Sequence, residues 1–173
     1  MSNVIWITGL SAAGKTTLAT AVTKRLRENG RAAVMLDGDE LREALAVTNT
    51  HARDSRLVLA HKYSRLARMI ARQGVTVVIG TVALFKEIHA WNRENLPGYF
   101  EVYLRVPIEE LRRRDPKGIY RRFDAGELTD VAGLDLPIDE PAAPHLLIDY
   151  QSGVTPEAEL DMLIRKFDAY TSA

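Results

Sequence analysis

The sequence GLSAAGKT at residues 9–16 constrains this chain more strongly than any other segment. It matches G-x-x-x-x-G-K-[ST] at every fixed position, the pattern of a loop that binds phosphate through backbone N–H groups. An apolar run at residues 4–8, typical of a strand, precedes this loop, and a predicted helix at residues 15–28 follows it. The glycine-rich loop, residues 9–16, therefore predicts a site for the phosphates of a nucleoside triphosphate.

The residue types in this loop suit a triphosphate with its metal ion. Lys15 is expected to bridge the β- and γ-phosphates as a point charge, and the Thr16 hydroxyl to ligate Mg²⁺. A glycine turn with a merely solvated lysine is the alternative, and the strand–loop–helix context argues against it. The residues expected to bind ATP are Gly9, Leu10, Ser11, Ala12, Ala13, Gly14, Lys15, Thr16 and Thr17.

Apolar runs and helical patterns alternate along the rest of the chain. Further strands are predicted at residues 32–36, 75–79, 100–106 and 145–148, and helices at residues 54–73, at residues 85–96, and after Pro107 and Pro156. Runs that are apolar throughout are typical of parallel strands buried on both faces. We therefore expect the α/β class, as a three-layer sandwich of the P-loop NTPase type with a five-stranded parallel sheet.

One domain is expected to span residues 1–173, because a chain of this length supports a single hydrophobic core. The segment at about residues 112–140 fits the alternation least, since it is charged, contains Gly and Pro, and has little periodicity. We interpret it as a lid whose arginines Arg113, Arg114 and Arg121 lie over the bound phosphates. A solvated charged face is the alternative.

Charge and composition narrow the function classes. The 23 basic and 23 acidic residues balance, which argues against a broad surface for nucleic acid or membrane. The absence of cysteine excludes a disulfide framework, a thiolate nucleophile and a Cys-ligated metal site. The uncharged apolar stretch at residues 74–85 is too short to cross a bilayer, which takes about 20 residues. We expect a cytoplasmic protein.

Two carboxylates, Asp37 and Asp39, follow the second predicted strand, at the sheet edge where ligands of open α/β folds gather. One could hold Mg²⁺ through water and the other accept a proton from an attacking hydroxyl. The alternative is a turn with a helix cap at Asp39. The chain has no Asn-Lys pair for reading guanine and is short for a motor protein, which leaves a small kinase.

At this point the sequence resembles the adenylylsulfate kinases, which transfer the γ-phosphate of ATP to the 3′-hydroxyl of adenylyl sulfate. The resemblance implies that Asp39 is the base and Asp37 the metal-side carboxylate. Arg42, Arg56 and Lys117 would contact the acceptor, with Lys117 in the lid. The segments that carry the resemblance are the glycine-rich loop, residues 36–42, residues 113–120, Ala125-Gly126-Glu127, Gly133-Leu134-Asp135, Pro141 and Pro144.

The sequence departs from this family where the acceptor base would bind. His51 and Val131 stand where the family has two phenylalanines that stack on adenine, and Leu59 replaces an asparagine. A lost stack costs about 1–3 kcal/mol. Residues 80–85 also replace the usual Ser-Pro-Tyr segment, and residues 87–107 resemble the cytidine diphosphoramidate kinases. Ordinary packing is the alternative for Trp91 and Tyr99 within that stretch.

These observations predict an ATP- and Mg²⁺-dependent kinase that phosphorylates a hydroxyl, by resemblance a ribose 3′-hydroxyl, of a small nucleotide-linked anion. The acceptor would be adenylyl sulfate or a relative, with cytidine diphosphoramidate in polysaccharide modification as the alternative. A nucleotide-binding regulatory module with little transfer activity is a candidate of another class. The helix at residues 54–73 could supply a homodimer face, although an amphipathic core helix explains the same stripe.

Overall fold

Five parallel strands form the sheet of the computed structural model, which describes residues 2–47 and 52–172. Their order across the sheet is β2-β3-β1-β4-β5, so the first strand of the chain lies at its centre. Ile7 of β1 pairs with Gly80 on one side and with Val102 on the other. The expected α/β class and the five-stranded parallel sheet are therefore confirmed. The strands are β1 (Val4–Gly9), β2 (Ala33–Asp37), β3 (Thr76–Thr81), β4 (Tyr99–Arg105) and β5 (Leu146–Asp149).

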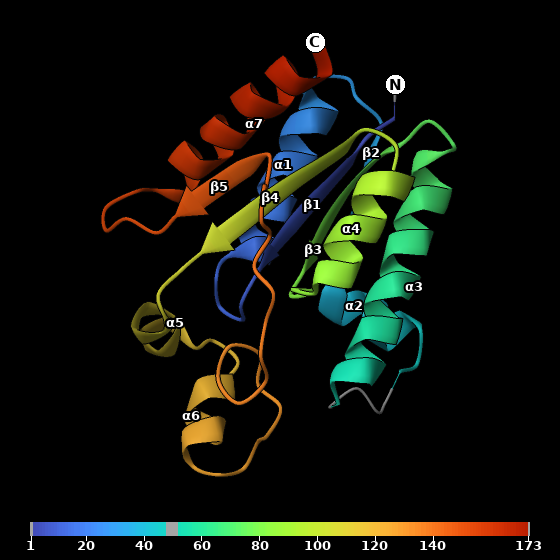
Figure 1. Cartoon of the computed structure of the whole chain (residues 1–173). Helices are drawn as coiled ribbons and strands as arrows, with labels where there is room; N and C mark the ends of the chain where they lie inside the picture. Colours follow the sequence, from blue (N-terminus) through green and yellow to red (C-terminus); the bar gives the residue numbers. More distant parts are fainter. Residues whose placement is uncertain (1, 48–51, 173) are drawn as a thin grey trace.

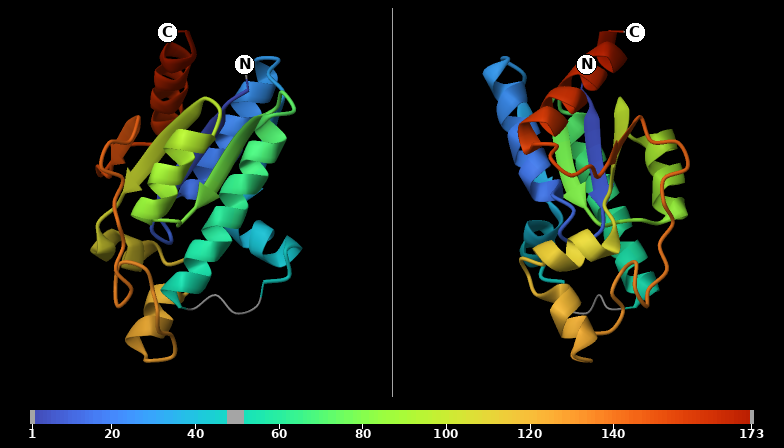
Figure 2. Two further views of the ribbon diagram at one scale, coloured as in Figure 1. Left: turned by 45° about the vertical axis from the view of Figure 1, so that its right-hand side comes forward. Right: turned by 90° about the vertical axis from the view of Figure 1, so that its left-hand side faces the viewer.

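Helices cover both faces of this sheet, which gives three layers (Figures 1 and 2). Helices α1 (Lys15–Glu28) and α7 (Pro156–Ser172) pack on one face, and α3 (Arg53–Ala71) and α4 (Lys86–Asn95) on the other. The alternation of side chains along β1 explains the layers. Ile5 and Ile7 are fully buried beneath α1 and α7, whereas Trp6 is fully buried beneath α3 and α4. A strand buried on both faces has to be apolar throughout.

Three short helices, α2 (Gly38–Ala44), α5 (Ile108–Arg114) and α6 (Ile119–Asp124), lie beyond the carboxyl ends of the strands (Figure 1). The expected start of the lid, residue 112, falls within α5. That helix continues to Arg114 because Glu110 pairs with the arginines three and four positions later. The sequence pattern did not predict α6, which is shorter than two turns and too short for a periodic signal.

None of the helices built from residues 2–47 and 52–172 is both long and apolar enough to cross a membrane. Trp91, for which ordinary packing was an alternative, contacts the His61 ring edge to face at 6.0 Å between centroids. Tyr99 is buried, and its hydroxyl donates to Glu101 Oε1 at 2.8 Å. Both aromatic side chains therefore serve the packing of α3, α4 and β4.

Candidate active site

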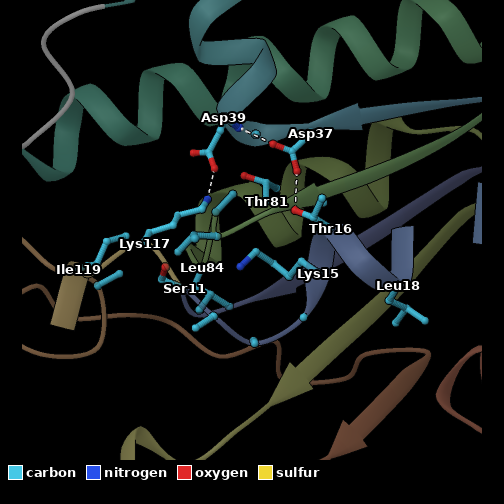
Figure 3. A pocket seen from close by; sticks show the side chains of 18 of the residues that line it. Ser11, Lys15, Thr16, Leu18, Asp37, Asp39, Thr81, Leu84, Lys117 and Ile119 are labelled. Carbon is cyan, nitrogen blue, oxygen red and sulfur yellow. Dashed lines mark hydrogen bonds and ion pairs between the residues drawn. The ribbon is translucent and has the colours of Figure 1, made fainter. Parts of the chain in front are cut away.

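A cavity of about 1080 Å³ opens at the carboxyl edge of the sheet, where loops after several parallel strands converge. Its lining combines the glycine-rich loop, the start of α2, one face of α3 and the segment between α5 and α6 (Figure 3). Polar and charged side chains gather on one part of the wall and apolar side chains on another. The described lining includes Ser11, Ala12, Ala13, Gly14, Lys15, Thr16, Thr17, Asp37, Asp39, Arg42, Arg56, Lys117 and Val131.

The glycine-rich loop bends tightly around the ammonium group of Lys15, which donates to the Leu10 carbonyl oxygen at 2.7 Å. Ala12 and Gly14 adopt left-handed φ angles of 65° and 98° within this bend. Burial, followed by repulsion from Lys117, lowers the pKa of Lys15 to about 8. Gly9 and Leu10 are themselves buried, so the lining begins at Ser11 and these two residues support the loop from behind.

Asp37 joins the glycine-rich loop to α2. Its Oδ2 accepts the Thr16 hydroxyl at 2.7 Å, and its Oδ1 accepts the backbone N–H groups of Asp39 at 2.9 Å and Glu40 at 3.4 Å. Burial alone would raise the pKa of Asp37, but these hydrogen bonds together hold it below its usual value. Asp37 is therefore an ionised N-cap of α2, and the alternative of a helix cap at Asp39 was wrong, because Asp39 lies inside the first turn.

The carboxylate of Asp39 points from the first turn of α2 into the cavity and forms an ion pair with Lys117 (Figure 3). Lys117 lies between α5 and α6, so the pair joins the lid segment to α2. Both side chains are more than half exposed. Asp39 is thus the carboxylate that a molecule entering the cavity would meet, whereas both oxygens of Asp37 already accept hydrogen bonds.

Two arginines from different elements reach the same side of the cavity. Arg56 of α3 donates to the Asp130 carbonyl oxygen at 2.6 Å, and burial together with repulsion from Arg42 lowers its pKa. Two guanidinium groups that repel one another across a cavity favour an anion between them. Val131 lines the cavity beside them and Leu59 lies on α3, while His51, the other residue expected there, lies outside the described residues.

The three lid arginines differ in position. Arg114 lines the cavity, lies 5.1 Å from the Tyr150 ring centroid and donates to the Ala12 carbonyl oxygen at 3.5 Å. Arg113 forms two hydrogen bonds to Glu110 at 2.7 Å and does not belong to the described lining, nor does Arg121. The structure therefore brings Arg114 alone of the three to the cavity, because the last turn of α5 directs its neighbour outward.

Sequence reasoning placed Leu59 and residues 80–85 on the acceptor side and missed the rest of the apolar wall of the cavity. This wall is formed by the loop after β3, by α3 and by the segment that returns from the lid, and its members are Leu59, Leu84, Phe85, Leu128, Ala132, Leu136, Pro137 and Ile138. The carboxylate of Asp135 fixes part of this segment by accepting the N–H groups of Asp130 and Val131 at 2.9 and 2.6 Å. A signal was present, since a loop after β3 must lie at the ligand-binding edge of a parallel sheet.

Comparisons with known sequences identify the family of this chain. The family model described as Adenylylsulphate kinase matches residues 1–149. The chain is 35% identical over 163 residues to the cytidine diphosphoramidate kinase of Campylobacter jejuni, covering 94% of this chain and 95% of that protein. It is also 35% identical over 162 residues to a probable adenylyl-sulfate kinase of Pyrococcus abyssi, covering 94% and 92%.

A comparison with solved structures gives the same result. The APS kinase of Mycobacterium tuberculosis, solved in complex with AMPPNP and APS, superimposes with a TM-score of 0.89 at 30% identity. The match covers 96% of this chain and 98% of that one. The fold and the sequence of this chain, with its glycine-rich loop, therefore match the adenylylsulphate kinases over nearly its whole length. The chain belongs to the adenylylsulphate kinase family of phosphotransferases.

Proposed function

We propose that this kinase transfers the γ-phosphate of ATP to a hydroxyl group of a small nucleotide-linked anion. The observation that carries the proposal is one cavity lined by the glycine-rich loop, by Asp37 and Asp39, and by the guanidinium groups of Arg42 and Arg56. The loop suits a triphosphate and the two arginines suit a second anion. Transfer between two bound anions is the chemistry that such a cavity serves.

On the ATP side, the backbone N–H groups of the glycine-rich loop and the N-terminus of α1 would bind the β- and γ-phosphates. Lys15 would leave the Leu10 carbonyl and pair with phosphate oxygens. Its buried ammonium group would then have a fully charged partner. Arg114, which already contacts the loop at Ala12, would add positive charge from the lid side. These groups position the γ-phosphorus and stabilise the charge on its oxygens.

Thr16 and Asp37 fit a magnesium site. Their side-chain oxygens meet at 2.7 Å, and hard oxygen donors of this kind are the ligands that Mg²⁺ prefers. Mg²⁺ is commonly held by one or two protein side chains together with phosphate oxygens and water. The ionised state of Asp37 supports this role. When bound, the ion would neutralise negative charge on the β- and γ-phosphates.

On the acceptor side, Arg42 and Arg56 would hold the acceptor's anionic group, and Asp39 would accept the proton of the attacking hydroxyl. That oxygen forms a bond to the γ-phosphorus as the bond from phosphorus to the β–γ bridging oxygen breaks, and ADP leaves. Lys117 would exchange Asp39 for an oxygen of the transferring group as the lid closes. The apolar wall excludes water from the reacting atoms.

The identity of the acceptor base depends on the apolar wall. Val131 and Leu59 offer aliphatic contact rather than an aromatic face or an amide for hydrogen bonding. A pocket of this kind binds a base by shape and burial, which favours an acceptor other than adenylyl sulfate. The similarity to the Campylobacter jejuni enzyme, over nearly the full length of both chains, supports cytidine diphosphoramidate as that acceptor, with adenylyl sulfate as the other candidate.

An ADP-release assay against several acceptors tests the proposal. Adenylyl sulfate, cytidine diphosphoramidate and simple nucleoside monophosphates are each added with ATP and Mg²⁺, and Lys15→Ala serves as the inactive control. We expect one nucleotide-linked anion to stimulate ADP release well above the rate with ATP alone. If none of them does so while ATP still binds, the chain is a nucleotide-binding module rather than a kinase of such acceptors.

A further inference from the structure

A carboxylate lies at the centre of a buried polar cluster behind the active-site wall. Glu101 on β4 is fully buried, and its oxygens accept the Tyr99 hydroxyl at 2.8 Å and a guanidinium N–H of Arg93 at 2.6 Å. His89 of α4 places its Nδ1 2.8 Å from the same carboxylate. Three side chains, from β4 and α4, therefore converge on this one carboxyl group.

The other ring nitrogen of His89 contacts a distant part of the chain. Its Nε2 lies 3.1 Å from the carbonyl oxygen of Asp139, which can only accept, so Nε2 is the donor of this hydrogen bond. The ring of His89 therefore bridges the Glu101 carboxyl group to the main chain at Asp139.

Asp139 belongs to the return segment, residues 136–140, which leads from the lid toward β5. Its N–H donates to the Leu84 carbonyl oxygen at 3.0 Å, and its carboxylate accepts the Lys86 N–H at 3.2 Å. Arg53, at the start of α3, approaches the same carboxylate at 3.5 Å. Asp139 therefore ties the return segment to the loop after β3 and to two helices.

The return segment contributes directly to the cavity, since Leu136, Pro137 and Ile138 form part of its apolar wall beside Leu84. This stretch contains neither helix nor strand, and an isolated bridge pairs Leu136 at its start with Ala132. Its distance from α3 and from the loop after β3 sets the width of the acceptor side. The hydrogen bond at Asp139 is partly buried and has a fixed direction, which apolar contacts lack.

We propose that His89, held by Glu101, is a positioning residue that fixes the return segment as the wall of the acceptor site. The expected effect on kinetics rests on the proposed function, whereas the expected effect on the structure does not. His89 lies outside the cavity lining and acts through the Asp139 carbonyl. Loss of the His89 ring would let the wall move away from the acceptor. The ATP side, which is held by α1 and the glycine-rich loop, would stay in place.

The kinetic test compares His89→Phe with wild type. We expect the acceptor KM to rise about tenfold or more, with the ATP KM within about twofold, because small displacements at a binding wall are costly. His89→Gln, which keeps a donor for the Asp139 carbonyl, should recover part of the loss and provides the test if His89→Phe does not fold. Leu26→Ala, buried in the opposite layer, controls for lost stability.

A second measurement is independent of activity. Amide hydrogen exchange of the return segment should accelerate about tenfold or more in His89→Phe but not in Leu26→Ala, because Asp139 without the His89 contact at its carbonyl is held less firmly against Leu84. Unchanged exchange overturns the attachment, and faster exchange with an unchanged acceptor KM overturns the positioning role. If no acceptor stimulates the wild type, the proposed function fails while exchange still tests the attachment.

Discussion

Lys117 and Asp39 form an ion pair that links the lid segment to the first turn of α2, although 78 positions separate them in the chain. Their side chains are 54% and 59% exposed. An ion pair so open to water contributes about 1 kcal/mol or less. The pair therefore orients the two residues toward the cavity without locking the lid, and each can exchange its partner for a substrate group.

The first prediction concerns Asp39. Asp39→Asn keeps the size of the side chain but removes the proton acceptor, so kcat should fall by about 10²–10⁴. ATP affinity should stay within about twofold, because Asp39 does not contact the glycine-rich loop. Rapid-quench turnover and calorimetric binding measure the two quantities. Unchanged turnover would remove Asp39 from the role of base.

A second prediction separates a catalytic role of Lys117 from its pairing with Asp39. If Lys117 moves onto the transferring phosphoryl group, Lys117→Met should lower kcat by about 10²-fold. The free energy of unfolding should change by less than about 1 kcal/mol, because the pair is exposed. Lys24→Met, which removes an exposed lysine paired with Glu28, is the matched control. Equal rates in the two variants would leave Lys117 with no part in transfer.

The third prediction follows from the pKa of Lys15, which burial and then Lys117 lower to about 8. A bound phosphate favours the protonated ammonium. The affinity for nucleotide is therefore highest below about pH 8 and decreases as the pH rises above that value. The Kd for a non-hydrolysable ATP analogue should increase about tenfold to thirtyfold from pH 7 to pH 9.5. Lys15→Arg does not titrate in this range, and its Kd should stay nearly constant.

Much of the fold could be predicted because it depends on local patterns. The five apolar runs became the five strands, since a strand buried on both faces is mostly apolar and holds a polar residue such as Glu101 only where partners satisfy it. The glycine-rich loop was equally local. The resemblance placed Asp37 at the metal side. Its function as the N-cap of α2 depends on the backbone geometry of residues 37–40, which their sequence alone does not determine.

What could not be predicted depends on contacts distant in sequence. The bond from the Arg56 guanidinium to the Asp130 carbonyl spans 74 positions, and that from the Tyr120 hydroxyl to the Ser11 carbonyl spans 109. Such contacts fix how the lid segment approaches α3 and the glycine-rich loop. The homodimer expected through the helix at residues 54–73 stays a prediction.

A fourth prediction tests the packing of the glycine-rich loop against the sheet. A Cβ atom at Gly9 would lie 2.7 Å from the Leu104 carbonyl oxygen of β4, a backbone atom that cannot easily move. Gly9→Ala should therefore lower the free energy of unfolding by about 1–3 kcal/mol in urea denaturation. Gly80→Ala, whose added Cβ would meet its nearest atoms at 3.6 Å, should cost less than about 1 kcal/mol. Equal losses would contradict the close approach.

The last prediction concerns the acceptor base. Val131 lines the cavity at a position where the resemblance implies an aromatic stack, and a stack on a base is worth about 1–3 kcal/mol. Because adenine presents a larger ring face than cytosine, Val131→Phe should raise kcat/KM for adenylyl sulfate relative to cytidine diphosphoramidate, by less than the roughly fivefold to hundredfold gain of a whole stack. Val154→Phe makes the same substitution at another point of the cavity, near the start of α7, and should leave that ratio unchanged. Parallel progress curves with the two acceptors measure the ratio for each variant. If Val131→Phe and Val154→Phe shift it equally, Val131 does not face the acceptor base, and the departure from the family at this position has no bearing on which acceptor is bound.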